Sequence, residues 1–501
     1  MPTLHQTIIA GFGLAGFAGA APVAQPDYSS MASQWLKNTK QTITWGSCPD
    51  MFPGNFTCAT LRVPLDWNRV DNYVNETIEL GMIRREADDK ANRIGYLFIN
   101  PGGPGGQATS AVVEGVGELD SEILARFDVV GLDPRGVGLS TPLQCDPAQF
   151  NKRIKFMPKT AEEYDALVQY NKDLGASCVE KSGRLVQYVD TISAAKDHEA
   201  VRLALGEKAN YLGLSYGTQL FGQYAQLFPN SFRAIVLDGN LQHSQTESTN
   251  LLVEATTYEM TLKQFFLWCD STESCALYSE DTEAVFKRVR DKATETPIPA
   301  PGCDNVVCRS DVTAEEILFS LQGFLVSQTS WPGFAEALLE ADNGNATILS
   351  NGLATGDVFE DSYLYAGTAI GCQDWAHAST DVADLVAKEN LGAVFSPLIL
   401  GSTQSYKLQT ECIGWPAPLT NPPAPITYKG KTKLLMLNSL YDPETSYTWA
   451  LGLQSEIQNA VLVTRNGSGH TSYLIGGETT DVANAYFLNL TLPEPGLITS
   501  T

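Results

Sequence analysis

The chain has 501 residues, of which 43% are hydrophobic and 18% are charged, and its formal net charge is -24. This composition excludes a disordered chain and provides enough apolar residues for a large buried core. The excess of acidic residues would repel phosphate groups, so we expect neither nucleic acid nor an anionic membrane surface as a partner. We interpret the acidity as a solvated surface rather than a specific cation site.

An apolar run rich in Ala and Gly lies near the N-terminus, at residues 8–20. Ala18, Gly19 and Ala20 give the small-x-small pattern that signal peptidases accept, although no Lys or Arg precedes the run. The run is too short to span a bilayer, and no other stretch has the length and apolarity of a membrane helix. The sequence therefore predicts a signal peptide at 1–20 and a secreted, extracellular protein.

Strand and helix patterns alternate along much of the remaining chain. Short runs of β-branched and aliphatic residues that end in turn residues predict strands at 77–84, 94–100, 127–133, 210–214, 232–237, 433–438 and 460–464. Helical apolar spacing predicts helices at 191–205, 216–228 and 480–488. Because parallel strands need crossover connections, this alternation predicts an α/β fold whose mostly parallel sheet is covered on both faces.

The pattern changes between residues 242 and 424, where long helical stretches and Pro-rich segments replace the buried strands. We interpret 242–424 as an inserted, largely helical lid. The catalytic core is then discontinuous, with a first part at 45–241 and a second part at 425–501. The Pro-rich stretch 416–425 is typical of a linker between lid and core.

A Gly-x-Ser-x-Gly motif at 213–217 follows a predicted strand and precedes a predicted helix. This is the context of a nucleophile elbow, in which two glycines allow a sharp turn that exposes the serine. The motif alone also occurs as an ordinary turn, but its context favours catalysis. The sequence therefore predicts Ser215 as a nucleophile.

A serine nucleophile needs a neutral imidazole within hydrogen-bond reach to take its proton. The chain has five histidines, and His470 follows the last predicted strand, where the base of such a site is expected. His5 lies in the predicted signal peptide, and His198 lies in a helix that would point it away from the site. His243 and His377 fall in the lid and stay open as alternatives.

The catalytic acid must orient the imidazole, and in α/β-hydrolases it stands between the serine and the histidine in the chain. Asp442 follows a predicted strand and satisfies both order and placement. Glu444 is the nearest competitor, and Asp442 could instead cap a turn before Pro443. We predict the triad Ser215, Asp442 and His470.

A glycine-rich loop at 100–106 directly follows a predicted strand upstream of the nucleophile. Backbone N–H groups of such a loop can stabilise the tetrahedral oxyanion. Since Pro101 and Pro104 have no N–H, Gly102, Gly103 or a later glycine of the loop is the expected donor, with Tyr216 as the second. A phosphate-binding role is excluded because no Lys-Ser/Thr pair follows the loop.

Cysteines and glycosylation sequons agree with export. The ten cysteines suit disulfides better than a metal site, and their spacing suggests the pairs Cys48–Cys58, Cys145–Cys178, Cys269–Cys275, Cys303–Cys308 and Cys372–Cys412, although sequence alone does not fix connectivity. The sequons are at Asn55, Asn75, Asn345, Asn466 and Asn489. Because Asn466 lies close to His470, we expect it to carry no glycan.

Together these motifs resemble the tripeptidyl-aminopeptidase-like branch of the proline iminopeptidase family (serine peptidase S33) of α/β-hydrolases. The resemblance rests on 100–106, 133–140, 213–218, 442–443, 469–472, 372–375 and 412–416, and it covers nearly all of the mature chain. The last two segments support pairing Cys372 with Cys412. Proline iminopeptidases usually carry His before the paired glycines, whereas this chain has Asn100-Pro101, which favours the tripeptidyl branch.

The resemblance implies a serine exopeptidase that acts on peptide bonds near free N-termini. Such a pocket should recognise an ammonium group, so a lid carboxylate is expected, and Asp374, Glu360 or Asp361 are candidates, although each is more often an ordinary solvated acid. Arg135 is expected to brace loops near the site rather than to react.

Two other functions stay open on the sequence alone. An esterase or other small-molecule acyl hydrolase uses the same triad and oxyanion chemistry, and a binding protein could retain the scaffold without activity. No metal or organic cofactor is implied, because no residue cluster has ligand spacing and the mechanism needs neither. Oligomeric state and the length of the released peptide are not indicated.

Overall fold

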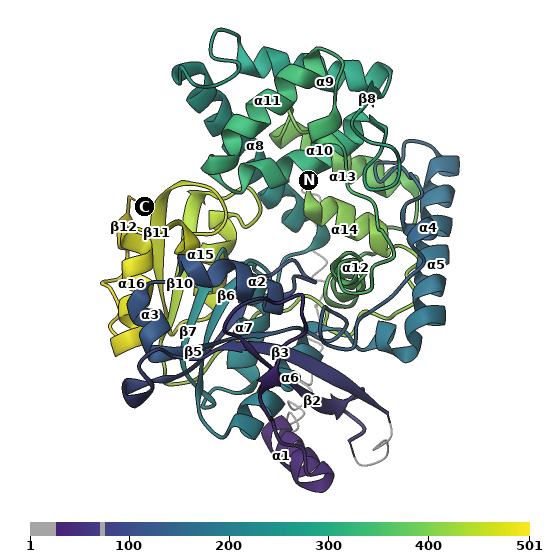
Figure 1. Ribbon diagram of the computed structural model, residues 1–501. Coiled ribbons are helices and arrows are strands. Elements are labelled where there is room, and N and C mark those ends of the chain that lie inside the picture. Colours follow the sequence, from purple (N-terminus) through teal and green to yellow (C-terminus); the bar gives the residue numbers. More distant parts are fainter. Residues whose placement is uncertain (1–26, 71–75, 501) are drawn as a thin grey trace, which may run out of the picture.

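The computed structural model describes residues 27–70 and 76–500 (Figure 1). The predicted signal peptide at 1–20 and the sequon at Asn75 lie outside the described residues. Within the described residues, no helix combines the length and apolarity needed to cross a bilayer.

A single large sheet forms the centre of the catalytic core, with strand order β1-β2-β3-β5-β4-β6-β7-β10-β11-β12. Its strands are β1 (Gly46–Ser47), β2 (Thr57–Pro64), β3 (Thr77–Arg85), β4 (Gly95–Asn100), β5 (Phe127–Leu132), β6 (Ala209–Leu214), β7 (Phe232–Asp238), β10 (Leu434–Tyr441), β11 (Ala460–Ser468) and β12 (Ile498–Thr499). In this order, every pair of neighbouring strands from β5 onward is parallel. The pairs β1–β2, β2–β3 and β3–β5 are antiparallel. The predicted α/β fold with a mostly parallel sheet is confirmed.

Helices cover both faces of this sheet because the central strands are apolar on both sides. All six residues of β6 are buried, and consecutive side chains enter opposite cores, Tyr211 with one and Leu212 with the other. The first core includes residues of α1 (Tyr28–Thr39), α6 (Thr191–Leu205), α7 (Gly217–Leu227) and α15 (Tyr447–Glu456). The second includes residues of α2 (Ala108–Gly115), α3 (Ser121–Arg126) and α16 (Glu478–Asn489).

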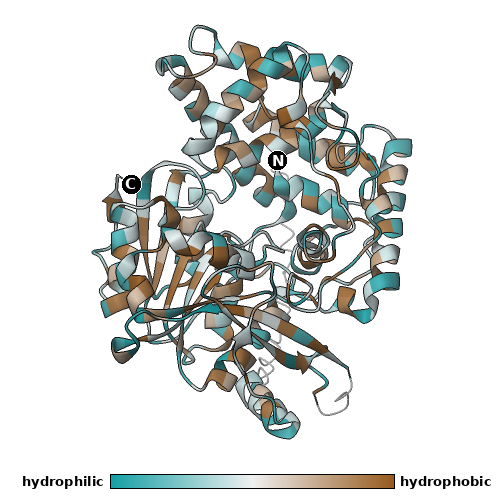
Figure 2. Cartoon of the chain, viewed as in Figure 1, coloured by the Kyte–Doolittle hydropathy of each residue, from teal (hydrophilic) through white to brown (hydrophobic). Residues whose placement is uncertain are grey.

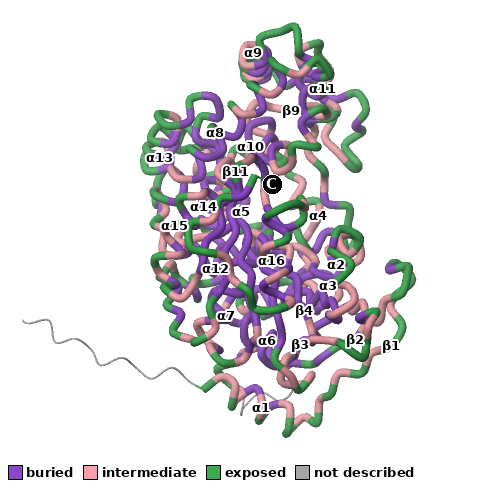
Figure 3. The backbone as a smooth tube through the Cα atoms, turned by 90° about the vertical axis from the view of Figure 1, so that its left-hand side faces the viewer, coloured by how far each residue is buried: buried purple, intermediate pink, exposed green. Residues whose placement is uncertain are grey.

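The same burial can be followed in the figures, where the strands of the sheet are mostly hydrophobic (Figure 2) and their backbone is largely buried (Figure 3).

The ends of helix α6 carry the expected capping signals. The side chain of Asp190 accepts a hydrogen bond from Ser193 N at the start of α6, and Gly206, with φ 79°, ends that helix in the left-handed region. These local signals determine where α6 begins and ends, and therefore where the chain enters β6.

The chain between β7 and β10 forms a helical cap above the carboxyl ends of the parallel strands (Figure 1). Its helices are α8 (Glu247–Ser271), α9 (Thr282–Glu295), α10 (Ala314–Leu325), α11 (Trp331–Asp342), α12 (Ser362–Asp374), α13 (Val382–Phe395) and α14 (Gln404–Cys412). Its only described strands are β8 (Ile298–Pro299) and β9 (Asp311–Val312). Helices α8 to α11 share an apolar core of their own.

Two helices from the first half of the chain pack beside the cap, which the sequence did not predict. They are α4 (Pro147–Phe150) and α5 (Ala161–Ser182). Both lie on the same side of the molecule as α12 and α14 in Figure 1, and Phe150 of α4 packs edge to face against Tyr365 of α12. The buried amide of Asn171 on α5 donates to the main-chain oxygens of Thr410 and Ile413. The cap is therefore stabilised by α4 and α5 from the first half of the chain as well as by contacts among its own helices.

Disulfides join all ten cysteines, in the pairs Cys48–Cys58, Cys145–Cys178, Cys269–Cys275, Cys303–Cys308 and Cys372–Cys412. The last of these joins α12 to α14 within the cap. Among the sequons in the described residues, Asn55, Asn466 and Asn489 are exposed and Asn345 is half-buried.

Candidate active site

Ser215 occupies the sharp turn between β6 and α7. Its φ is 56°, in the left-handed region that costs an L residue energy, and such strain is typical of a nucleophile elbow. A Cβ at Gly213 would lie 2.3 Å from the main-chain oxygen of Gly217, so only glycine fits there. The N–H of Ser215 donates to the main-chain oxygen of Asp238 at 2.8 Å, which fixes the elbow to the end of β7.

Asp442 and His470 follow the neighbouring parallel strands β10 and β11, so both reach the same edge of the sheet. Nδ1–H of His470 donates to Asp442 Oδ2 at 2.8 Å. The carboxylate of Asp442 also accepts from the N–H groups of Glu444 and Thr445 and from the Thr445 hydroxyl. The acid is thereby fixed in place, and it orients the imidazole as the sequence predicts for a catalytic acid.

Glu444 contacts the other nitrogen of the same imidazole. Its Oε2 lies 3.3 Å from Nε2 of His470, the nitrogen that must accept the Ser215 proton. Within residues 27–70 and 76–500, no hydrogen bond joins the Ser215 hydroxyl to His470. Sequence reasoning named Asp442 and Glu444 as competitors for one role, whereas the structure places them on opposite sides of the ring.

These two carboxylates decide the protonation of His470. Burial by itself lowers the pKa of the imidazole, but the negative charges of Asp442 and Glu444 outweigh burial and raise the pKa to about 9. Burial raises the pKa of Glu444 and outweighs the opposing effect of the His470 charge, and the neighbouring charge of Asp442 adds to the rise. In this geometry the protonated imidazolium is therefore favoured at neutral pH.

The glycine-rich loop lies against the nucleophile. A Cβ at Gly102, where φ is 97°, would lie 2.7 Å from Cβ of Ser215 and 2.9 Å from N of Tyr216. The Gly102 N–H, however, donates to Oδ1 of Asn100 at 3.1 Å, so Gly102 provides close approach rather than an oxyanion donor. The N–H groups of Gly103 and Tyr216 have no acceptor among the described residues, and these two groups can serve an oxyanion.

Asp238 is a further residue of the site that sequence reasoning missed. Its side chain is buried, and Oδ2 accepts from the N–H groups of Ser472 and Tyr473, just after His470. Its main-chain oxygen holds Ser215. Asp238 thus links the nucleophile turn to the histidine loop. The sequence feature that could have identified it is its place at the end of a central strand.

The cap reaches the histidine loop directly. The N–H of His470 donates to the main-chain oxygen of Val326, at the end of α10, at 2.7 Å. On the same helix, the buried amide of Gln322 donates to Glu254 on α8 and to the main-chain oxygen of Pro443, both at 2.8 Å. The cap therefore supports the loops that carry both the acid and the base.

The other described histidines serve packing. His198 is buried among Phe98, Tyr211 and Phe221, and burial lowers its pKa to about 3. His243 is also buried and contacts the Gln223 amide and the main-chain oxygen of Asp374. His377 contacts the main-chain oxygen of Trp375. None of them contacts Ser215 or Asp442, so the alternatives to His470 as the base are not supported.

Two of the three candidate ammonium-binding carboxylates are held by hydrogen bonds within the protein. Asp374 is fully buried and accepts hydrogen bonds from Thr191, Gln219 and Asn421. Burial raises its pKa to about 7. Asp361 is buried and accepts from the N–H groups of Thr355 and Gly356, whereas Glu360 is exposed.

Arg135 braces loops, as expected. Its guanidinium is fully buried and pairs with both carboxylate oxygens of Asp197, each at 2.7 Å. It also donates to the main-chain oxygens of Pro64, Leu65 and Tyr188. Every one of these partners lies away from the reacting atoms.

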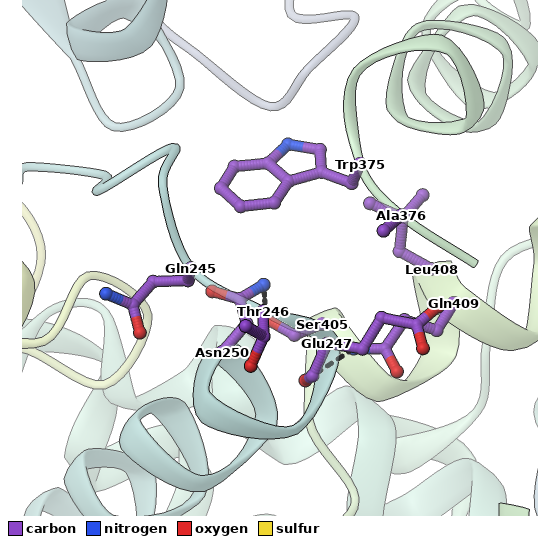
Figure 4. A pocket seen from close by; sticks show the side chains of 9 residues that line it. All are labelled: Gln245, Thr246, Glu247, Asn250, Trp375, Ala376, Ser405, Leu408 and Gln409. Atoms are coloured by element: carbon purple, nitrogen blue, oxygen red, sulfur yellow. Dashed lines mark hydrogen bonds between the residues drawn. The ribbon is translucent and has the colours of Figure 1, made fainter. Parts of the chain in front are cut away.

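A small recess in the cap lies between α8, α14 and the chain after α12 (Figure 4). It is lined by Gln245, Thr246, Glu247, Asn250, Trp375, Ala376, Ser405, Leu408 and Gln409. Oδ1 of Asn250 and Oε1 of Gln409 are buried without a hydrogen-bond partner in the described chain. Asn250 donates to Ser405 within this recess, and Gln404, the neighbour of Ser405, donates to Glu444 at 2.8 Å.

Among the described residues, no group of three or more His, Cys, Asp or Glu side chains could hold a metal ion.

Comparisons with known proteins agree with this arrangement. A family model described as alpha/beta hydrolase fold matches residues 96–300, and one described as TAP-like protein matches residues 396–498. Serine protease Hip1 of Mycobacterium tuberculosis is 28% identical over 91% of this chain and 90% of its own. Carboxylesterase B of the same species is 28% identical over 96% and 92%, and tripeptidyl aminopeptidase of Streptomyces lividans is 27% identical over 85% and 80%.

A solved thermophilic esterase from Thermogutta terrifontis is also similar, with 13% identity and a TM-score of 0.35 over 84% of this chain and 96% of that one.

Proposed function

Because the chain belongs to the TAP-like branch of the α/β-hydrolases, we propose that it is a secreted serine exopeptidase that cleaves peptide bonds near free N-termini through an acyl-enzyme on Ser215. The observation that carries this proposal is the pairing of His470 with Asp442 at the edge of the sheet where the elbow exposes Ser215. Nucleophile, acid and base follow β6, β10 and β11, all at the carboxyl edge of the same sheet.

Each residue has a defined task in this proposal. The Ser215 hydroxyl attacks the carbonyl carbon, and its proton passes to Nε2 of His470 while Asp442 stabilises the imidazolium. The N–H groups of Gly103 and Tyr216 donate to the oxyanion. The imidazolium then protonates the leaving amine, and water attacks the acyl-enzyme with His470 as base, which restores Ser215.

One observation supports a peptide rather than a simple ester as substrate. Relatives of similar identity carry the names serine protease and tripeptidyl aminopeptidase. A carboxylesterase relative keeps ester hydrolysis as the alternative.

Secretion is part of the same proposal. It is supported by the predicted signal peptide at 1–20 and by five disulfides, which form and persist in oxidising compartments. N-terminal sequencing of protein recovered from culture medium tests it, and the expected mature chain begins after Ala20. Recovery of the full-length chain inside the cell alone would contradict secretion.

The decisive experiment compares matched fluorogenic peptides with free and acetylated N-termini, assayed at acidic and neutral pH with the wild type and Ser215→Ala. We expect the wild type alone to cleave, and only free N-termini. A parallel set of simple esters tests the alternative. If esters are hydrolysed and no peptide is, the peptidase proposal fails and the esterase function replaces it.

A further inference from the structure

Asp238 binds both the turn that carries the nucleophile and the loop that carries the base. Its main-chain oxygen accepts from the N–H of Ser215 at 2.8 Å. Its side-chain Oδ2 accepts from the N–H groups of Ser472 and Tyr473, at 2.8 and 2.7 Å. The residue therefore fixes the position of Ser215 relative to the chain that follows His470.

The other side-chain oxygen of Asp238 has no such task. Oδ1 is buried and has no hydrogen-bond partner among the described residues. The nearby guanidinium of Arg465 donates instead to main-chain oxygens of the histidine loop. A buried charge without a bonded cation costs energy. Since a neutral side chain could also accept from two N–H groups, the hydrogen bonds alone do not explain why this residue carries a charge.

His470 is the neighbouring group that becomes a cation during the reaction. A Cβ at Gly239, the residue after Asp238, would lie 3.0 Å from Cε1 of His470, so the chain after β7 passes directly beside the imidazole. When the ring accepts the Ser215 proton, it becomes an imidazolium. A negative charge at Asp238 lowers the energy of that state, in addition to the charge of Asp442.

Resting on the proposed function, we propose that Asp238 is a positioning residue for the triad: it joins the nucleophile turn to the histidine loop, and its negative charge stabilises the imidazolium of His470. The proton transfers remain those of the triad, from Ser215 to Nε2 and from Nε2 to the leaving group. Asp238 stays ionised and neither gives nor takes a proton in these steps.

The ionisation of both groups agrees with this role. Burial raises the pKa of Asp238 to about 6, against the opposing effect of the N–H groups that it accepts, so the carboxylate is charged at neutral pH. Burial lowers the pKa of His470, whereas Asp442, Glu444 and Asp238 all raise it. The other charged groups that face this region are Asp442 and Glu444 after β10, Arg465 on β11, Glu254 on α8 and Asp120 before α3.

The test measures the rate at which a fluorophosphonate labels Ser215 as a function of pH, together with kcat/KM for the best peptide or ester substrate of the wild type. A fluorophosphonate does not ionise, so the acidic limb of its labelling rate reports the base of the free enzyme. Asp238→Asn and Asp238→Ser both remove the charge and differ in size, so the measurement does not depend on one variant. Thermal unfolding establishes which variants are folded.

In the folded neutral variants, we expect the acidic limb to lie about half a pH unit or more below that of the wild type, because the base loses a negative neighbour. The rate on the plateau should fall about threefold or more, which is the equivalent of half a pH unit. Asp238→Glu keeps the charge and should keep the wild-type limb, even where its longer side chain slows the reaction.

Asp133→Asn is the matched control. Asp133 is also buried, follows the parallel strand β5, and accepts from the N–H groups of Thr109 and Leu139. Burial raises its pKa to about 6, as it does for Asp238. Loss of this carboxylate should lower the melting temperature but leave the acidic limb at the wild-type pH.

An unchanged limb in the folded neutral variants of Asp238 would overturn the inference, because the residue would then act only as a structural support. A shift of equal size in Asp133→Asn would overturn it as well. If the wild type hydrolyses neither peptides nor esters and Ser215 is not labelled, the proposed function itself fails. The two failures are therefore distinct.

Discussion

The main-chain N–H of His470 donates to the main-chain oxygen of Val326 at 2.7 Å, so the end of cap helix α10 is attached to the loop of the catalytic base. The bond joins residues far apart in the sequence and uses no side chain. A shift of α10 must therefore move the imidazole, and such shifts of a catalytic group are costly for the rate.

Gln322 offers a way to test this attachment, because its amide joins α10 to Glu254 and to the main-chain oxygen of Pro443, next to Asp442. We expect Gln322→Leu to lose about 1–3 kcal/mol of unfolding free energy, since buried acceptors lose their donor. We expect kcat/KM to fall roughly tenfold as the acid loop loosens. Ser320→Ala is the control, because its hydroxyl bonds only within α10. Equal activity in both variants would contradict the link.

The left-handed conformation of Ser215, with φ 56°, makes a prediction about stability as well as activity. Ser215→Ala and Ser215→Gly should both lose activity by roughly 10⁴-fold or more, because the nucleophile is gone. Glycine adopts positive φ without steric cost, so Ser215→Gly should be more stable than Ser215→Ala by about 1 kcal/mol. Denaturant unfolding of the two variants measures the difference, and an Ala variant of equal or greater stability would show that the turn is not strained.

Gly102 should tolerate no side chain. A Cβ there would press on Ser215 and on N of Tyr216, one of the two available oxyanion donors. We expect Gly102→Ala to lower kcat by about 10²-fold or more, the usual scale for losing an oxyanion donor. Gly115→Ala in α2 is the matched control, since nothing lies within 4 Å of its Cβ position, and it should leave kcat unchanged. Comparable losses in both variants would argue for a general packing defect.

Asp374 should behave as a structural residue. Asp374→Asn should cost about 1–3 kcal/mol at neutral pH, because the new amide faces the Gln219 donor. Burial raises the carboxyl pKa to about 7, above its unfolded value near 3.8. Its contribution to stability is therefore complete below about pH 4 and is lost as pH rises through 7. Between pH 4 and 7, the melting temperature of the wild type should fall more than that of Asp374→Asn. Both proteins should keep the same preference for substrates with free N-termini. A lost preference would restore Asp374 as the ammonium site.

Periodicity in the sequence predicted the parallel strands and the placement of Ser215, Asp442 and His470, because buried strands and their turns leave strong local patterns. Strand β2 was missed because it has exposed residues in alternation and contains Arg62 and Pro64. That pattern is typical of a strand near the edge of a sheet rather than of its centre.

The finer chemistry could not be predicted because it depends on orientation. Asp442 and Glu444 are two residues apart, and only the turn at Pro443 sends them to opposite nitrogens of one ring. Gly102 was one of the candidate oxyanion donors, yet its N–H donates to Asn100, and that contact depends on a side-chain rotamer. The Val326 contact is made entirely by backbone and leaves no residue signature at all.

The order of the strands in the chain also sets when activity can arise during synthesis. The nucleophile elbow is complete once β7 has joined β6, but the base follows β11, which can pair only after the entire cap and β10 have been made. Until β11 has been made, a nascent chain therefore has the serine but not its base, and hydrolytic competence requires the final strands.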